Sequence, residues 1–135
     1  MNDGDLLLRI AETLRQEIAP AVVAEYPKTQ AFMAAVVLQK LGRQVALAAE
    51  HARAARADLD ALIGDLTTSV ADGEGELPRA VAHLAQSRNA AALCGLIETL
   101  YASRGALGEP RFEELLARVR RTLRADIERR MEYAE

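Results

Sequence analysis

Apolar residues recur at three- and four-residue intervals along most of the chain, and this spacing is typical of one face of an α-helix. In the first segment they are Leu7, Ile10, Leu14 and Ile18. We expect Asp3 or Asp5 to cap this helix, because a carboxylate there accepts from the free N–H groups of the first turn. Pro20 disfavours helical conformation at Ala19, so the helix should end or kink at that residue.

A second helix is predicted from Thr29, after a stop at Pro27, to about Ala57. Its apolar stripe consists of Met33, Val37, Leu41, Val45 and Ala48. The other faces also carry apolar side chains, namely Phe32, Val36 and Leu38. A helix that is apolar on all sides is normally surrounded by other helices, so we expect this one in the middle of a bundle.

Asp58 is expected to cap a short third helix. Its apolar residues are Leu59, Leu62, Ile63, Leu66 and Val70. The stretch "VADGEGELP" contains two glycines and a proline, so the main loop is predicted there. Pro78 then suits the first turn of a fourth segment. That segment carries Val81, Leu84, Leu93, Leu96, Ile97 and Leu100. Whether the helix is interrupted between Ser87 and Asn89 stays open.

Gly105, Gly108 and Pro110 end the fourth segment. The last helix carries Phe112, Leu116, Val119, Leu123, Ile127 and Met131 at helical spacing. No segment alternates with a two-residue period, as a half-buried strand would. The prediction is an all-α fold, with residues 1–135 forming a single domain and a bundle of four to six helices.

Gly42 and Gly95 lie inside predicted helices, where glycine costs about 1 kcal/mol relative to alanine. Two interpretations stay open for each. The cost is simply tolerated, or another helix approaches so closely that a side chain would clash. For Gly42, whose apolar neighbours on the same side are Leu38 and Val45, we expect the bare Cα to face another helix.

The charge balance argues against two classes of partner. A formal net charge of −3 gives no general attraction to nucleic acid or to anionic lipid. The longest wholly apolar run, from Ala31 to Leu38, is short for a membrane span, and the acidic start is unlike a secretory signal. The single cysteine, Cys94, forms no internal disulfide. We expect a cytoplasmic protein with no membrane partner, for which nucleic acid is the least favoured partner.

The segment "TQAFMAAVVLQKLGRQV" resembles an uncharacterised family of small bacterial all-helical proteins, as do "LLLRIAETLRQEIAPAV" and "AALCGLIETLYASRGALGEPRFEELLARVRRTLRADI". The chain departs from that family at Thr29, where an aromatic residue is frequent, and around Val36 and Val37, where asparagine is common. The family has no established activity, so the resemblance implies no catalytic residues. It implies a bacterial protein whose gene lies near genes for aminoglycoside-phosphotransferase-like kinases and acyl-CoA dehydrogenases.

The sequence lacks a recognisable catalytic or metal-binding constellation. Neither His51 nor His83 has a glutamate three residues before it, as a di-iron bundle requires. Cys94 stands among apolar residues with no base beside it, so we expect a buried structural thiol. The acids between Asp72 and Glu76 lack calcium-loop spacing and are interpreted as a surface loop. We predict no catalytic residue, metal or cofactor.

Two groups of polar residues are candidates for binding a small anion. Lys40, Arg43 and Gln44 interrupt the apolar second helix. They mark either a helix leaving the core or the rim of a pocket closed by Tyr26, Phe32 and the last helix. The stretch from Arg118 to Arg130 has six arginines and two acids, and its candidate residues are Arg120, Arg121 and Arg124. The alternative there is a solvated helix face with internal ion pairs.

Our leading hypothesis is a non-enzymatic helical accessory protein that acts through protein contacts. It forms a homodimer or binds a kinase-like or acyl-CoA-metabolising partner. The alternative is a binding module for a small anionic metabolite, either phosphorylated or of the acyl-CoA type. Nucleic-acid binding ranks last, because no aromatic residue stands among the arginines to stack on a base.

Overall fold

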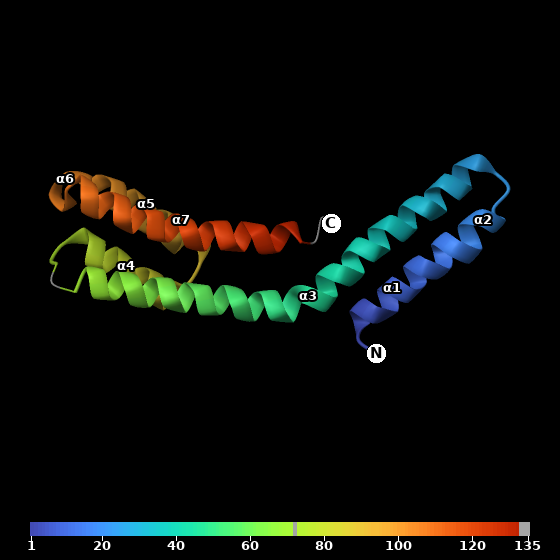
Figure 1. Cartoon of the computed structure of the whole chain (residues 1–135), viewed down its shortest axis with the longest axis horizontal. Coiled ribbons are helices and arrows are strands. Elements are labelled where there is room, and N and C mark those ends of the chain that lie inside the picture. Colours follow the sequence, from blue (N-terminus) through green and yellow to red (C-terminus); the bar gives the residue numbers. More distant parts are fainter. Residues whose placement is uncertain (72, 133–135) are drawn as a thin grey trace. The chain divides into compact units, whose positions relative to one another are not determined.

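The computed structural model describes residues 1–71 and 73–132, and the regular structure in these ranges is entirely helical (Figure 1). The elements are α1 (Asp3–Thr13), the π-helical turn η1 (Leu14–Ile18), α2 (Ala19–Ala21), α3 (Glu25–Ser69), α4 (Glu76–Ser87), α5 (Ala90–Ala102), α6 (Arg104–Leu107) and α7 (Glu109–Met131). The elements α1, η1 and α2 follow one another without a gap, so the described residues form six helices. The all-α prediction of four to six helices is confirmed.

The first helix begins with a reciprocal cap at Asn2. The Asn2 side chain accepts from the N–H of Asp5 at 2.9 Å, and the Asp5 carboxylate accepts from the N–H of Asn2 at 3.3 Å. Each side chain thereby satisfies a donor that the helix itself leaves unpaired. The prediction that Asp3 or Asp5 is the cap is wrong, because Asp5 occupies the third helical position instead.

The chain stays helical through Pro20, so the predicted end at Ala19 is wrong, whereas a kink there stays a prediction. Pro20 lies inside α2, and the π-helical turn η1 comes directly before it. The N–H of Ala19 donates to the carbonyl of Leu14, five residues back. Proline has no N–H and crowds the preceding turn, and a widened turn accommodates both defects.

Helix α3 runs without interruption over 45 residues. Pro27 falls in its first turn, where no N–H is needed, and no further proline occurs before Ser69. The predicted end near Ala57 and the predicted cap at Asp58 are therefore wrong. An aspartate caps a helix only where the backbone leaves helical geometry, and nothing in this sequence forces that at Asp58.

The fourth segment, whose continuity the sequence left open, is divided into two helices. Helix α4 ends at Ser87, and Arg88 adopts the left-handed conformation with φ of 50°. The Asn89 side chain then accepts from the N–H of Ala92 at 2.8 Å and caps α5. The predicted main loop is confirmed over its described residues, and Pro78 lies in the first turn of α4. Asp72 lies outside the described residues.

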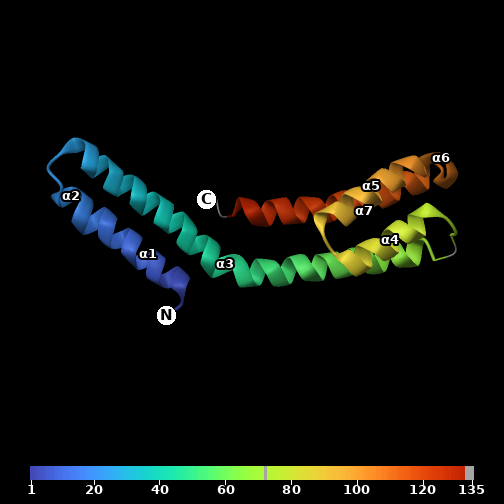
Figure 2. The same ribbon diagram turned by 180° about the vertical axis from the view of Figure 1, so that it is seen from behind.

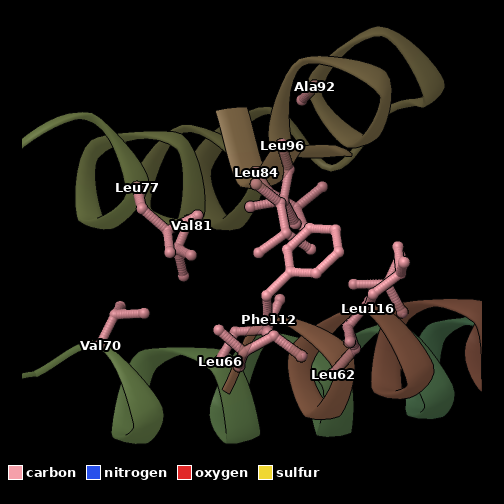
Figure 3. Packing of buried hydrophobic residues seen from close by; sticks show 13 residues of the cluster. Leu62, Leu66, Val70, Leu77, Val81, Leu84, Ala92, Leu96, Phe112 and Leu116 are labelled. Atoms are coloured by element: carbon pink, nitrogen blue, oxygen red, sulfur yellow. The ribbon is translucent and has the colours of Figure 1, made fainter. Parts of the chain in front are cut away.

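The described residues fall into two compact units. The second unit, Ala54–Ile127, holds a conventional hydrophobic core between the end of α3, α4, α5 and α7. Its buried residues are Leu62, Leu66, Val70, Leu77, Val81, Leu84, Ala92, Leu96, Leu100, Phe112, Leu115, Leu116 and Val119. The ring of Phe112 lies between Leu84 and Leu96 on one side and Leu66 on the other (Figure 3). That residues 1–135 form a single domain stays a prediction.

The first unit comprises Met1–Arg53 and the end of α7 from Glu128. Most of it is an antiparallel helix pair, which we call the N-terminal hairpin. One arm consists of α1, η1 and α2, and the other is the part of α3 up to Arg53 (Figure 2). Residues 22–24 connect its two arms. In the middle of α3, at the open end of the hairpin, the His51 imidazole lies 3.0 Å from a carboxylate oxygen of Glu132.

Candidate interaction surface

The predicted anion-binding residues divide between the two units. Lys40, Arg43 and Gln44 belong to the N-terminal hairpin, whereas Arg120, Arg121 and Arg124 belong to the second unit. Five of the six are exposed and Arg43 is half-buried. None of the five cations forms an ion pair among the described residues. Their role in binding an anion stays a prediction.

The pocket expected around Lys40 cannot be closed by Tyr26. The Tyr26 side chain stands in the first turn of α3 and is 76% exposed. At about 1.5 Å per residue it lies roughly 21 Å along the helix from Lys40. Phe32 is also exposed. The aromatic closure that we expected is therefore absent, because both rings project from a helix with few neighbours.

One arginine of the C-terminal cluster has a structural partner in α3. The Arg118 guanidinium donates to the Asp65 carboxylate at 2.6 Å and to the Thr122 hydroxyl at 2.8 Å. The side chain of Arg118 is mostly buried by these contacts. This contact joins α7 to α3 within the second unit, so this arginine serves the fold rather than a ligand.

The groups that carry chemistry are dispersed. Cys94 is exposed on the outer side of α5, so the prediction of a buried thiol is wrong. The core side of α5 carries Ala92, Leu96 and Leu100, and Cys94 falls between these positions. His83 lies 3.4 Å from the Ser87 hydroxyl, one turn along α4. Among residues 1–71 and 73–132, no three His, Cys, Asp or Glu side chains are grouped to hold a metal ion.

The N-terminal hairpin is held together along a seam of small residues. Its buried residues are Gly4, Ala11, Ala19, Ala35 and Gly42. A methyl group added to Gly4 would lie 2.8 Å from the Gly42 carbonyl oxygen, and one added to Gly42 would lie 2.9 Å from Leu8 Cγ. The close-approach interpretation of Gly42 is thus confirmed. For Gly95 it is wrong, because an added methyl group meets open space.

The large apolar side chains of the N-terminal hairpin remain accessible. The predicted buried stripe of α3 is exposed, with Met33 at 56%, Val37 at 53%, Leu41 at 44% and Val45 at 45%. Leu6 and Ile10 of α1 are exposed as well. The expectation that this part of α3 lies in the middle of a bundle is wrong, because its large apolar side chains stay exposed and its buried positions are mainly glycine and alanine.

These exposed residues are the surface that sequence reasoning missed. Their spacing is that of a core stripe, and the hydrophobic pattern alone cannot tell a covered stripe from an open one. A second signal was present in the sequence. Gly4 and Ala11 are seven residues apart, as are Ala35 and Gly42, and small residues at this spacing allow two helices to approach closely.

Helix α3 is long and apolar enough to span a membrane, judged by length and composition alone. Its most apolar 18-residue window has a mean hydropathy of 1.2, and 11% of that window is buried. The core helix of a soluble protein meets the same criteria. Its partner helix carries the exposed charged residues Arg9, Glu12 and Glu17, and charges are costly against lipid.

A polar cavity marks one side of the N-terminal hairpin. It has a volume of about 290 Å³ and is lined by Leu8, Ala11, Glu12, Arg15, Gln16 and Gln39. The Arg15 guanidinium donates to the Gln39 side-chain oxygen at 3.0 Å, and Gln16 donates to Glu12 at 3.1 Å. Lys40, Arg43 and Gln44 do not line it.

Comparisons with known proteins leave the function to be argued from the residues. No family model matches the sequence, no curated protein matches it, and no solved structure matches the fold.

Proposed function

We propose that this protein is a non-enzymatic accessory protein that acts through protein contacts made by the N-terminal hairpin. The observation that carries the proposal is the difference between the two units. The second unit buries Leu, Val and Phe side chains, whereas the fully buried apolar side chains of the first unit are Ala11, Ala19 and Ala35. The larger apolar side chains of the hairpin are the ones left accessible.

Such an arrangement is unfavourable for a helix pair that stays alone in water. Helices in proteins are stabilised mainly by packing of an apolar face, and each methyl-sized group buried contributes only about 0.8 kcal/mol. Contiguous apolar surface on a soluble protein marks an interaction site. A bound polypeptide would cover Ile10, Leu41 and Val45 and stabilise the hairpin.

The resemblance to small bacterial helical proteins favours a partner in a small-molecule pathway. A kinase-like or acyl-CoA-metabolising enzyme is the partner that this resemblance implies, and a second copy of the chain is the other. The chemistry of the described residues is compatible with an accessory role, since no three His, Cys, Asp or Glu side chains among them are grouped to hold a metal ion. We also propose a cytoplasmic location, because the net charge of −3 gives no general attraction to anionic lipid.

In-cell photo-cross-linking tests the proposal. A photoreactive amino acid placed at Leu41 should form adducts with a polypeptide, whereas the same amino acid at Ala91, exposed on α5 of the second unit, should form few. Gel mobility and mass spectrometry identify the adducts. Absence of polypeptide adducts at Leu41, in a host that expresses the protein at its natural level, would overturn the proposal.

A further inference from the structure

One side of the N-terminal hairpin is apolar and carries no charge between its ends. The Arg15–Gln39 hydrogen bond and the polar cavity mark the other side. On each helix, consider the side chains that come just before the seam residues as the chain turns about the helix axis. Because the two helices are antiparallel, these side chains lie on the same side of the pair. This side, which we call the uncharged face, consists of Leu6, Leu7, Ile10, Leu14, Leu38, Leu41 and Val45.

Charged residues adjoin the uncharged face only near its ends. At helical spacing, Asp3 and Glu17 fall beside the first and the last turn of the α1 side. On α3 the residues interspersed at this spacing are alanines, and Lys40 and Arg43 point to the polar side. Two copies of such a face can meet without burying an unpaired charge, which would otherwise oppose association.

The area of the uncharged face is sufficient for pairing with a copy of itself. Four of its side chains are about half exposed and three are partly buried. At roughly 60–120 Å² per large aliphatic side chain, and with the intervening alanines, the face offers on the order of 400 Å² of apolar surface. Homodimer interfaces are about 65% apolar, so two copies would bury roughly 1,200 Å². Stable interfaces begin at about that size.

The α3 edge of this face has the same sequence spacing as a helix–helix interface within the second unit. Apolar residues recur along α3 at intervals that alternate between three and four positions. They are Leu38, Leu41, Val45, Ala48, Ala52, Ala55, Leu59, Leu62 and Leu66. This is the spacing of a helix seam that packs against another helix. Its final residues, Leu62 and Leu66, are buried in one cluster with Phe112 and Leu116 of α7. Near its start, Leu38 is half-buried and Leu41 and Val45 are exposed.

We propose that the uncharged face binds the uncharged face of a second copy of this chain. Two hairpins would then form a four-helix bundle around a two-fold axis. A two-fold interface uses the same patch on both subunits, so a single self-complementary apolar face suffices. Pairs of antiparallel helices with short connections are the usual components of four-helix bundles. The inference rests on the proposed function and names its partner.

Sedimentation velocity on the purified full chain tests the self-pairing. The expected sedimenting species has twice the 14.7 kDa mass of one chain. Leu41→Glu and Ile10→Glu place a carboxylate at the centre of the face and should raise the dissociation constant at least tenfold. Val36→Glu is the matched control, because Val36 is similarly exposed on the same helix but lies on the polar side. It should leave the dissociation constant within a factor of about two.

Because the substituted side chains are accessible in a single chain, far-ultraviolet circular dichroism should show unchanged helix content in all three variants. A purified chain that sediments as a monomer at every concentration overturns the self-pairing. If in-cell cross-linking at Leu41 nevertheless gives adducts with a different polypeptide, the accessory function stands and the second copy is wrong as its partner. If the chain is a monomer that floats with lipid vesicles, both the self-pairing and the accessory function are overturned. The same holds if the chain is a monomer and gives no cross-linked adducts in cells. If Val36→Glu and Leu41→Glu raise the dissociation constant of the dimer equally, the assignment of this face is also overturned.

Discussion

Gly4 of α1 lies against Gly42 of α3, so closely that each occupies the space a side chain of the other would need. A methyl group at Gly4 would lie 2.8 Å from the Gly42 carbonyl oxygen and 3.0 Å from the Ala46 nitrogen. Both atoms belong to the backbone of α3 and cannot move aside without shifting the helix. The two arms of the hairpin are therefore in contact at their main chains.

Gly4→Ala and Gly42→Ala should both destabilise the protein, by about 1–3 kcal/mol in the free energy of unfolding. The gain in helix propensity, about 1 kcal/mol at most, is smaller than the expected clash. Urea unfolding followed by circular dichroism measures the change. Gly64→Ala and Gly95→Ala are matched controls, because an added methyl group meets nothing within 4 Å at either site. These two should be neutral or stabilising, and a stabilised Gly4→Ala would contradict the close contact.

Phe112→Ala should destabilise the second unit by about 3–5 kcal/mol, as is usual when a buried aromatic side chain is truncated. Phe112 is 1% exposed, and its ring meets that of Tyr101 edge to face at a centroid distance of 5.2 Å. Phe32→Ala in the N-terminal hairpin removes the same atoms from an exposed position. Its cost should be much smaller in urea unfolding. Equal costs would mean that Phe32 is covered in solution.

Arg88 joins α4 to α5 in the left-handed conformation, with φ of 50°. Its guanidinium also pairs with the Asp60 carboxylate. Arg88→Gly and Arg88→Ala both remove that ion pair, so the difference between them isolates the backbone conformation. Glycine adopts positive φ freely, and Arg88→Gly should be more stable than Arg88→Ala by about 1 kcal/mol. An alanine variant of equal thermal stability would argue against the left-handed turn.

Glu109 accepts two hydrogen bonds from the Arg104 guanidinium, at 2.6 and 3.0 Å. The hydrogen bond from Arg104 lowers the pKa of Glu109 from its ordinary value of 4.5. A carboxylate with a lowered pKa stabilises the fold above its unfolded-state pKa, and this contribution is lost as pH falls through the folded-state pKa. The wild type should therefore be slightly more stable than Glu109→Gln at pH 7, and the difference should vanish well below pH 4.5.

Thermal melts at neutral and acidic pH measure that difference. Glu98→Gln serves as the control, because Glu98 is exposed on α5 and forms no ion pair among the described residues. Its difference from wild type should not follow the same pH dependence. A Glu109→Gln variant whose deficit persists unchanged in acid would exclude the ion pair as its cause.

The sequence was sufficient to predict the fold class and much of the second unit. Leu62, Leu84 and Phe112 were predicted core residues, and they are buried. Helical spacing identifies a core correctly when the rest of the chain supplies the covering helices. The break between α4 and α5 was left open by the sequence, and the signal for it was Asn89, because asparagine favours the N-cap position.

The same reasoning failed in the N-terminal hairpin for a physical reason. Spacing reports which residues share a face, but it does not report whether another helix covers that face. Leu41 and Val45 have the spacing of core residues and are exposed, whereas Ala35 and Gly42 are buried. The continuity of α3 past Asp58 was missed because an isolated aspartate resembles a cap. Only tertiary structure decides whether the backbone stops there.

Amide hydrogen exchange at two protein concentrations tests most directly the claim that a second chain covers the N-terminal hairpin. If opening of the hairpin follows dissociation of a dimer, the dissociated fraction falls with the square root of concentration. A tenfold higher concentration should then slow exchange in α1 about threefold by mass action. Amides of α4 in the second unit, whose core is complete within one chain, should exchange at the same rate at both concentrations. Exchange in α1 that is independent of concentration, with the chain a monomer throughout, would contradict the account.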